Sequence, residues 1–499
     1  MNKIDVLRDI TFGQRVAEDE GDTLESYFVE TDSWRRLYAD GVDIVYGPKG
    51  AGKSALYSLL IARTDDLFDR QVILAPAENP RGAPAFQDLV TDPPATERQF
   101  IALWKLYFVC LVSARFDELG ISGEEADEAR AHLEREGLVL GRRTLQGLLR
   151  SVVAYVRKAI QPASVEAGVA VDPNTQLPVG FSGKISFHEP DASAIQSGIA
   201  SVDNLLGLCN SALAKADYSL WLMLDRLDVA FAESPELEKN ALRALFKVYL
   251  DLLAHKRLRL KIFLRTDIWR KVTEHGFREA SHITRTMTIG WNKGSLLNVL
   301  VRRAVQNANL LEYYGVAAEQ VTMSAATEKE FFYQMCPDQV DVGSRRPATL
   351  DWMLSRTQDG TQQNAPRELI HLLNSLRDEQ VRHLEIGDPE PEGTRLFQGG
   401  TFKDALPEVS RARLEQTLYA EHPDLRPLLE GLREEKTSQS VASLASIWSI
   451  PEEDARRKAR ELTEVGFFEE RGMKTDPEFW VPFLYRDALQ LVQGSADQD

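Results

Sequence analysis

Short runs of apolar residues, each bounded by turn or polar residues, recur through the first 290 positions of the chain. Val42–Tyr46 is one such run, and a glycine-rich turn and Ser54–Ala62, which has the composition of a helix, follow it. Further runs are Gln71–Ala75, Tyr218–Leu224 and Leu260–Leu264. Continuous apolar strands of this length are typical of parallel sheets covered by helices on both faces. The pattern predicts an α/β core over residues 1–290.

The strand pattern is interrupted between about residues 77 and 190. Apolar positions recur at helical spacing over 97–117 and 124–160, and strand-like sequence punctuated by Gly and Pro follows. We interpret this segment as a mainly helical insertion, to which the pattern assigns no function.

Beyond residue 290 the periodicity becomes helical and predicts a helical lid over 291–385. Residues 386–404 are rich in Pro, Gly and acidic side chains and predict a linker. Residues 405–499 predict a winged-helix-like domain. Two helical segments, Val441–Ile450 and Glu452–Val465, precede two strand-like segments, Phe467–Gly472 and Phe479–Pro482.

The glycine-rich turn carries the clearest chemical signal. Residues 47–54 match the pattern GxxxxGK[ST] and lie between a predicted strand and a predicted helix, as a phosphate-binding loop requires. In such a loop, backbone N–H groups converge on phosphate, Lys53 reaches the β and γ oxygens, and the Ser54 hydroxyl ligates Mg²⁺. The sequence therefore predicts a nucleotide-binding loop formed by Gly47, Pro48, Lys49, Gly50, Ala51, Gly52, Lys53, Ser54 and Ala55.

Two carboxylates follow the apolar run that ends at Leu224. Asp225 comes directly after it, which is how a Walker B strand presents a carboxylate to magnesium. An apolar strand followed by a turn aspartate is common, so the metal-binding interpretation depends on the P-loop. Asp228 is a candidate to polarise the attacking water, because hydrolysis needs a carboxylate that is not bound to the metal. An ion pair of Asp228 with Arg226 or Lys261 is an equally good interpretation.

Two arginines are candidate phosphate sensors. Arg265 ends a third apolar run at the sheet edge where α/β folds place ligands, and Arg367 lies near a predicted helix start in the lid. For each, the alternative is an arginine at the protein surface.

Charge and cysteine content limit the kinds of binding partner and the cellular compartment that we expect. Acidic residues number 76 against 59 basic ones, so the formal charge of -17 argues against coating nucleic acid or an anionic membrane. The three cysteines, Cys110, Cys209 and Cys336, lie far apart in apolar surroundings and fit a reducing compartment. Apolar stretches such as Leu106–Ala114 are shorter than the roughly 20 residues of a membrane span. We expect a cytoplasmic protein without a membrane segment.

The C-terminal region allows two interpretations. A basic cluster on its second helix could read DNA, or could pair with carboxylates of the same helix. Residues 411–499 contain 12 basic and 18 acidic side chains, which favours pairing. The basic cluster is Arg456, Arg457, Lys458 and Arg460. Seven large apolar residues nearby suggest a protein-docking surface, with core packing as the alternative: Phe467, Phe468, Phe479, Trp480, Phe483, Leu484 and Tyr485.

The series of P-loop, Leu224–Asp228, Phe263–Asp267 and Ala365–Arg367 resembles STAND and KAP-type P-loop NTPases of the AAA+ class. More narrowly, the segment ahead of the P-loop is similar to that of a group of bacterial P-loop ATPases, through Phe12-Gly13, Ala17-Glu18 and Tyr27–Val29. The resemblance implies ATP rather than GTP, Mg²⁺, sensor roles for Arg265 and Arg367, and an ATP-driven switch that often self-associates. Arg226 stands where many AAA+ members have Glu, which implies slow hydrolysis. KAP proteins commonly carry transmembrane insertions, which are not evident in this sequence.

Three functions follow as hypotheses. The first is an ATP-binding switch, hydrolysing or gated by ATP, that binds itself or a protein partner, with a role in bacterial stress or phage defence by family analogy only. The second is a DNA-associated ATPase that uses the winged helix. The third is a nucleotide-binding scaffold that does not hydrolyse ATP.

Overall fold

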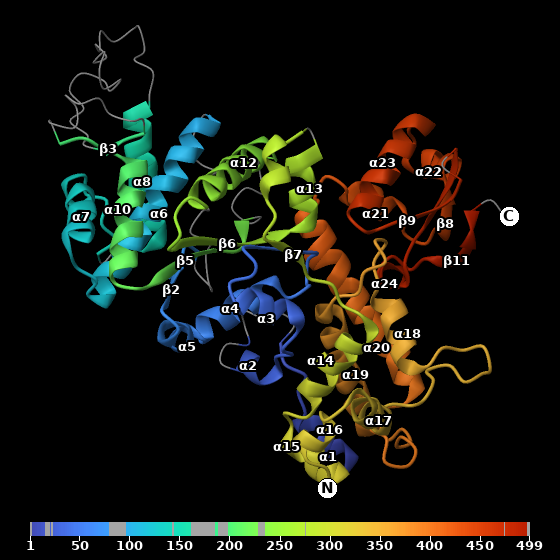
Figure 1. Ribbon diagram of the computed structural model, residues 1–499. Helices are drawn as coiled ribbons and strands as arrows, with labels where there is room; N and C mark the ends of the chain where they lie inside the picture. The colour runs from blue at the N-terminus through green and yellow to red at the C-terminus, as the bar shows by residue number, and fades with distance from the viewer. Residues whose placement is uncertain are drawn as a thin grey trace. The chain divides into compact units, whose positions relative to one another are not determined.

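The computed structural model describes residues 2–14, 20, 23–78, 96–141, 144–160, 185–187, 198–227, 235–274, 276–473 and 475–496. Contacts divide the chain into two compact units. Unit 1 contains Met1–Val29, Lys49–Gly52 and Gly290–Asp499, and unit 2 contains Glu30–Pro48 and Lys53–Ile289. Figure 1 labels the helices and strands of both units.

Unit 2 is built on a five-stranded sheet in the order β2-β5-β6-β1-β7. Every neighbouring pair is parallel, so the carboxyl ends of all five strands lie at one edge. This confirms the predicted α/β class with a P-loop NTPase-type parallel sheet. Only β7 was not predicted, because it is three residues long and mostly polar. The strands are β1 (Ile44–Gly47), β2 (Val72–Pro76), β5 (Ser219–Leu224), β6 (Leu258–Arg265) and β7 (Thr286–Thr288).

The two faces of this sheet bury different residues, because successive side chains of a strand point to opposite sides. On one face, Leu222 and Ile262 belong to the main core of unit 2, which α12 (Pro235–Leu252) covers. On the other face, Phe263 packs edge-on against Tyr57 of α4 (Lys53–Ala62), with ring centroids 5.6 Å apart. The helix that follows the P-loop therefore lies on the face of the sheet opposite to α12.

The predicted insertion is helical where the structure describes it. Its first helix, α6 (Glu97–Leu119), begins where the Thr96 hydroxyl accepts the Gln99 N–H at 3.3 Å, and ends at Gly120 with φ 68°. α6 is longer than the apolar stretches noted in the sequence, and by length and composition it could cross a membrane. However, 83% of its apolar window is buried inside the protein. It packs on α12 and α10. The other elements are α7 (Glu124–Arg135), α8 (Leu145–Ile160), α10 (Val202–Lys215), and a pair of two-residue strands, β3 (Ile185–Ser186) and β4 (Ala200–Ser201).

The other described helices of unit 2 are short. They are α3 (Asp32–Tyr38), α5 (Thr64–Asp69), α13 (Thr266–Glu274) and the 3₁₀ helix η4 (Arg278–His282).

The N-terminal residues pack in unit 1, whereas the sequence placed them in the core that spans 1–290. Val6, Leu7 and Phe12 are buried in the same cluster as residues of α14 and α19. Arg303 is buried against the Glu20 carboxylate and donates to the Phe12 carbonyl at 2.8 Å. The helices involved are α1 (Lys3–Asp9), α2 (Leu24–Tyr27), α14 (Lys293–Ala304) and α19 (Pro366–Glu385).

Residues 386–404, predicted to be a linker, belong partly to the core of unit 1. Leu396 and Phe397 are buried, and both of their N–H groups donate to the Met335 carbonyl, at 3.0 and 3.1 Å. The helix α20 begins at Gly399, so the predicted domain boundary at 405 falls inside it. The pattern of Pro, Gly and acidic residues hid these two apolar anchors. The neighbouring helices are α15 (Ala308–Tyr314), α16 (Ala318–Val321), α17 (Ala325–Met335), α18 (Thr349–Thr357) and α20 (Gly399–Arg413), which continues as the π-helix η5 (Leu414–Tyr419).

The C-terminal part of unit 1 contains the predicted order of two helices followed by two strands. Two helices, α22 (Val441–Trp448) and α23 (Glu452–Glu464), are followed by the antiparallel hairpin of β9 (Glu469–Met473) and β10 (Asp476–Trp480). Two strands that were not predicted complete a sheet of order β11-β8-β10-β9. They are β8 (Lys436–Ser440) and β11 (Val492–Ser495), and the remaining helices are α21 (Arg426–Gly431) and α24 (Phe483–Arg486).

A buried ionic network ties β1, β6 and the segment before β7 together. Lys261, which is fully buried, donates to Asp43 at 2.9 Å and to the Val42 carbonyl at 2.6 Å. Arg285 donates to the second oxygen of Asp43 at 2.6 Å. Asp43 precedes β1, so the network fixes the strands near the amino end of β1 and leaves its carboxyl end to the phosphate loop.

We expect Asp43→Ala to destabilise the protein by about 3 kcal/mol, because the buried Lys261 ammonium loses the carboxylate that it contacts. Asp217→Ala is the matched control: its exposed pair with Arg257 should be worth about 0–1 kcal/mol. Urea unfolding of the full chain, followed by circular dichroism, measures both. Equal midpoints for the two variants would contradict a structural role for the network.

Candidate functional site

The phosphate loop joins β1 directly to α4. β1 ends at Gly47 and α4 begins at Lys53, as the sequence predicted. Between them, Gly50 and Gly52 adopt φ values of 78° and 95°, which side chains with a Cβ rarely adopt. The glycines of the motif therefore supply the backbone shape that turns a buried strand into a helix N-terminus.

Lys53 is positioned over the start of its own loop. Its ammonium donates to the carbonyl oxygens of Gly47 and Pro48, each at 2.9 Å. Ser54 follows in the first turn of α4 and is half-buried, as are Lys53 and Ala55. A lysine and a hydroxyl at a helix N-terminus fit the chemistry of a phosphate group, which takes N–H donors and positive charge.

Asp225 lies beside α4 on the same sheet face as Tyr57. It follows β5 in step with Trp221, whose ring lies 4.4 Å below the Lys261 ammonium, on the face opposite to the main core. Burial raises the pKa of Tyr57 well above its usual range, and the negative charge of Asp225 and then Glu78 raises it further. Asp225 and α4 therefore lie on the same face of the sheet.

Ser54 and Asp225 would hold a magnesium ion together with phosphate oxygens. Among the described residues there is no group of three His, Cys, Asp or Glu side chains that could hold a metal by themselves. Mg²⁺ usually binds through one or two protein oxygens plus substrate phosphates and water, so this sparse pair fits it. Bound there, the ion would neutralise charge on the phosphate oxygens.

Arg265 stands directly beside the start of the loop. Its Cα pairs with that of Gly47 across β6 and β1. Its guanidinium forms two hydrogen bonds with Asp267, at 3.1 and 2.9 Å. Burial opposes the charge of Asp267, but the Arg265 guanidinium lowers the pKa of this carboxyl overall. A phosphate contact by Arg265 would therefore share the guanidinium with Asp267.

The other two candidates have different outcomes. Asp228 lies outside the described residues. Arg367, in the first turn of α19, lies against Gly50 of the phosphate loop, which belongs to the same unit: a Cβ at Gly50 would stand 3.2 Å from the Arg367 Cβ. Its neighbour Glu368 accepts a hydrogen bond from Arg413 at 2.8 Å, which anchors this turn to α20. The sensor role of Arg367 stays a prediction.

The structure adds a carboxylate that the sequence reading missed. Glu78 lies two residues beyond β2 and is fully buried. The hydroxyl of Tyr57 donates to its main-chain carbonyl at 2.9 Å. The signal in the sequence was the same as for Asp225, an apolar run followed by an acidic residue, but two residues separate Glu78 from the end of its strand.

Three of the four residues of the basic cluster pair with carboxylates, including Arg460 with Glu470 at 3.9 Å, and Arg456 donates to the Thr475 carbonyl at 3.4 Å. Arg457 contacts Asp454 at 2.7 Å, and Lys458 contacts Glu461 at 2.7 Å, both on α23. Of the seven large apolar residues, five are buried, so core packing accounts for most of them and the predicted docking surface is wrong in that form. The two that stay half-buried, Trp480 and Phe483, pack against arginine guanidiniums.

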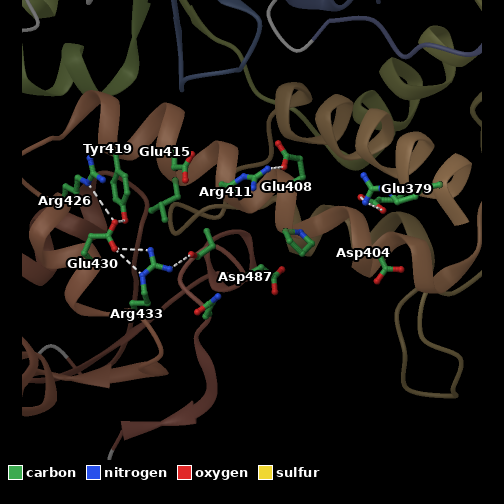
Figure 2. Close-up of a pocket in the computed structure, with 15 residues that line it drawn as sticks. Glu379, Asp404, Glu408, Arg411, Glu415, Tyr419, Arg426, Glu430, Arg433 and Asp487 are labelled. Atoms are coloured by element: carbon green, nitrogen blue, oxygen red, sulfur yellow. Dashed lines mark hydrogen bonds and ion pairs between the residues drawn. The ribbon is translucent and has the colours of Figure 1, made fainter. Parts of the chain in front are cut away.

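A polar cleft of about 800 Å³ opens in unit 1 beside η5 (Figure 2). In it, Glu430 accepts hydrogen bonds from Tyr419 at 2.8 Å and from Arg433 at 3.0 Å. The other arginines that line it also contact carboxylates: Arg382 with Glu379, Arg411 with Glu408 and Arg426 with Glu430. Because its positive charges are matched in this way and it shares no residue with the P-loop, we do not place the nucleotide there.

Comparison with known proteins adds little beyond this geometry. No protein family and no curated protein matches the chain. A similar solved structure is that of the ORC2 protein of Aeropyrum pernix in ADPNP–ADP complexes, with 12% identity over 96% of this chain and 95% of that one. The TM-score is 0.29, so the assignment of the site rests on the P-loop and the strand order.

We expect Lys53→Ala to abolish tight binding of a fluorescent ATP analogue, because it removes a charge that the loop delivers to the β and γ phosphates. Lys215→Ala, at the exposed end of α10, is a matched control that should leave affinity unchanged. Equilibrium titration measures both variants. Parental affinity in Lys53→Ala would refute the phosphate-loop assignment.

We expect the C-terminal domain not to grip duplex DNA through phosphate contacts, because its basic helix pairs with its own carboxylates. Titration of the full chain with duplex DNA at about 50 and 200 mM salt should show no steep salt dependence. Micromolar binding with a steep slope, lost when Arg456, Arg457, Lys458 and Arg460 are changed to Ala, would reverse this conclusion.

Proposed function

We propose that this chain is an ATP-binding and slowly ATP-hydrolysing molecular switch that acts through a change of conformation or through self-association. The observation that supports the proposal is the strand, glycine-rich loop and helix that present Lys53 and Ser54 at the start of α4, together with Asp225 directly after β5 at the same edge of the sheet. These are the groups that a P-loop enzyme uses to hold phosphates and magnesium. Arg265, at the same sheet edge, adds a positive charge beside Gly47.

Slow rather than fast hydrolysis follows from the residue after Asp225. Arg226 adopts φ 57°, so the backbone turns sharply there, and a cation stands where a catalytic glutamate is common in the AAA+ class. An enzyme without a carboxylate at that place must draw on another one, or bind ATP for long periods. Both suit a switch, in which the lifetime of the ATP state sets the signal.

The narrower assignments stay predictions. The STAND or KAP subtype, a role in stress or phage defence, the protein partner and the cytoplasmic location depend on the motif series and the composition alone. A DNA-associated ATPase remains the alternative function, and the paired charges of α23 speak against its simplest form.

We expect ATP to change the mass or shape of the protein, and phosphate to be released slowly. Light scattering with and without ATP, combined with a phosphate-release assay, tests both parts. Arg367→Ala should reduce the ATP-induced change and leave ADP affinity nearly intact, because only a γ-phosphate contact distinguishes the two nucleotides. ATP binding with neither a structural change nor phosphate release would leave only the scaffold function, and equal loss of ADP and ATP affinity would refute the sensor role.

A further inference from the structure

ATP hydrolysis needs a carboxylate near the γ-phosphate that is not already bound to the metal. Asp225 is the candidate metal ligand, and the next residue is Arg226, so neither can fill this role. Asp228 lies outside the described residues. Another carboxylate at the carboxyl edge of the sheet would meet the chemical need, and Glu78 is at that edge.

The strand register places Glu78 beside Asp225. β2 and β5 are parallel neighbours, with Pro76 paired to Met223. The ladder continues past the end of β2, because the Ala77 N–H donates to the Met223 carbonyl at 2.8 Å. Glu78 and Asp225 therefore follow the ends of two adjacent strands, Asp225 directly after β5 and Glu78 two residues after β2.

Tyr57 of α4 relates the two residues to one face of the sheet. Its hydroxyl donates to the Glu78 carbonyl at 2.9 Å. Asp225, in step with Trp221, points to the sheet face on which Tyr57 packs. The negative charges of Asp225 and Glu78 each raise the pKa of the Tyr57 hydroxyl, so both carboxylates act on the same group.

Glu78 is also held firmly. The Tyr57 hydroxyl donates to the Glu78 carbonyl at 2.9 Å, and the Tyr107 hydroxyl donates to the Ala77 carbonyl at 2.8 Å. The residue is fully buried, and full burial of a carboxylate is costly and uncommon. A backbone fixed at two successive carbonyls suits a group that must position one water molecule.

We propose that Glu78 is the carboxylate that orients and deprotonates the attacking water. This inference rests on the proposed ATP hydrolysis. The water oxygen forms a bond to the γ-phosphorus as the bond from that phosphorus to the β–γ bridging oxygen breaks. Glu78 accepts the water proton and later releases it to solvent, so ADP and inorganic phosphate are formed without any other reactant. Sequence reading gave this role to Asp228, and the experiment separates the two.

The test compares Glu78→Gln with Asp228→Asn in the full-length protein. Glu78→Gln keeps the size of the side chain and removes its charge, so we expect phosphate release to fall at least about 100-fold. ATP affinity should stay within about threefold, because the side chain is assigned no contact with the ground-state phosphates. Chromatography of the nucleotide that remains bound after incubation should find ATP in this variant and ADP in the parent.

Three controls make the outcomes distinct. Glu385→Gln, at the exposed end of α19, makes the same chemical change away from the site and should behave as the parent. Glu78→Asp keeps the negative charge but shortens the side chain by one methylene group. We expect it to hydrolyse ATP more slowly than the parent and faster than Glu78→Gln. It serves as the test if Glu78→Gln does not fold. Thermal unfolding identifies a variant that has lost its structure.

Parental phosphate release by Glu78→Gln would overturn the proposal, and loss of release in Asp228→Asn alone would give the role to Asp228. Loss of ATP affinity together with hydrolysis in folded Glu78→Gln would also overturn it, because the assigned role begins after binding. These results leave ATP hydrolysis by the protein intact. A parent protein that binds ATP and releases no phosphate would instead remove the hydrolytic function, and Glu78 with it.

Discussion

The parallel pairing of β1 with β6 is the constraint on which the candidate site depends. It sets Gly47 beside Arg265 and brings the ends of β5 and β6 to the edge from which the phosphate loop leaves. The pairing is secured near the amino end of β1, where Asp43 joins Lys261 and Arg285 in a buried network. The buried charges of this network thus align β1 with β6 near the amino end of β1, and the carboxyl end of β1 is left for a ligand.

The strands of this sheet could be predicted from sequence because each is a short apolar run with polar flanks. The site could be predicted only where one residue carries the signal by its position in a motif, as Lys53 and Asp225 do. Glu78 could not, because its importance comes from a register between strands that are more than 140 residues apart in the chain. The buried anchors Leu396 and Phe397 were hidden for a related reason, since polar neighbours dominated the local pattern.

The C-terminal domain shows how a charge cluster can mislead. On sequence alone, four basic residues on the second helix of a winged-helix-like fold suggest DNA. In the structure, Arg457 and Lys458 contact acids one turn away, and most of the nearby aromatic residues fill the core. Helix spacing decides the matter, because residues three and four apart face each other, so alternating acidic and basic groups neutralise locally.

The burial of the first residues in unit 1 has a consequence for synthesis. Phe12 reaches its place only when Arg303 and the helices around it exist, so these first residues must wait on the ribosome while nearly 300 others are made. Unit 2 is encoded in between, and domains generally fold as they emerge. The order of translation therefore lets the sheet of unit 2 form first, whereas the core of unit 1 is completed later around a segment that was made before it.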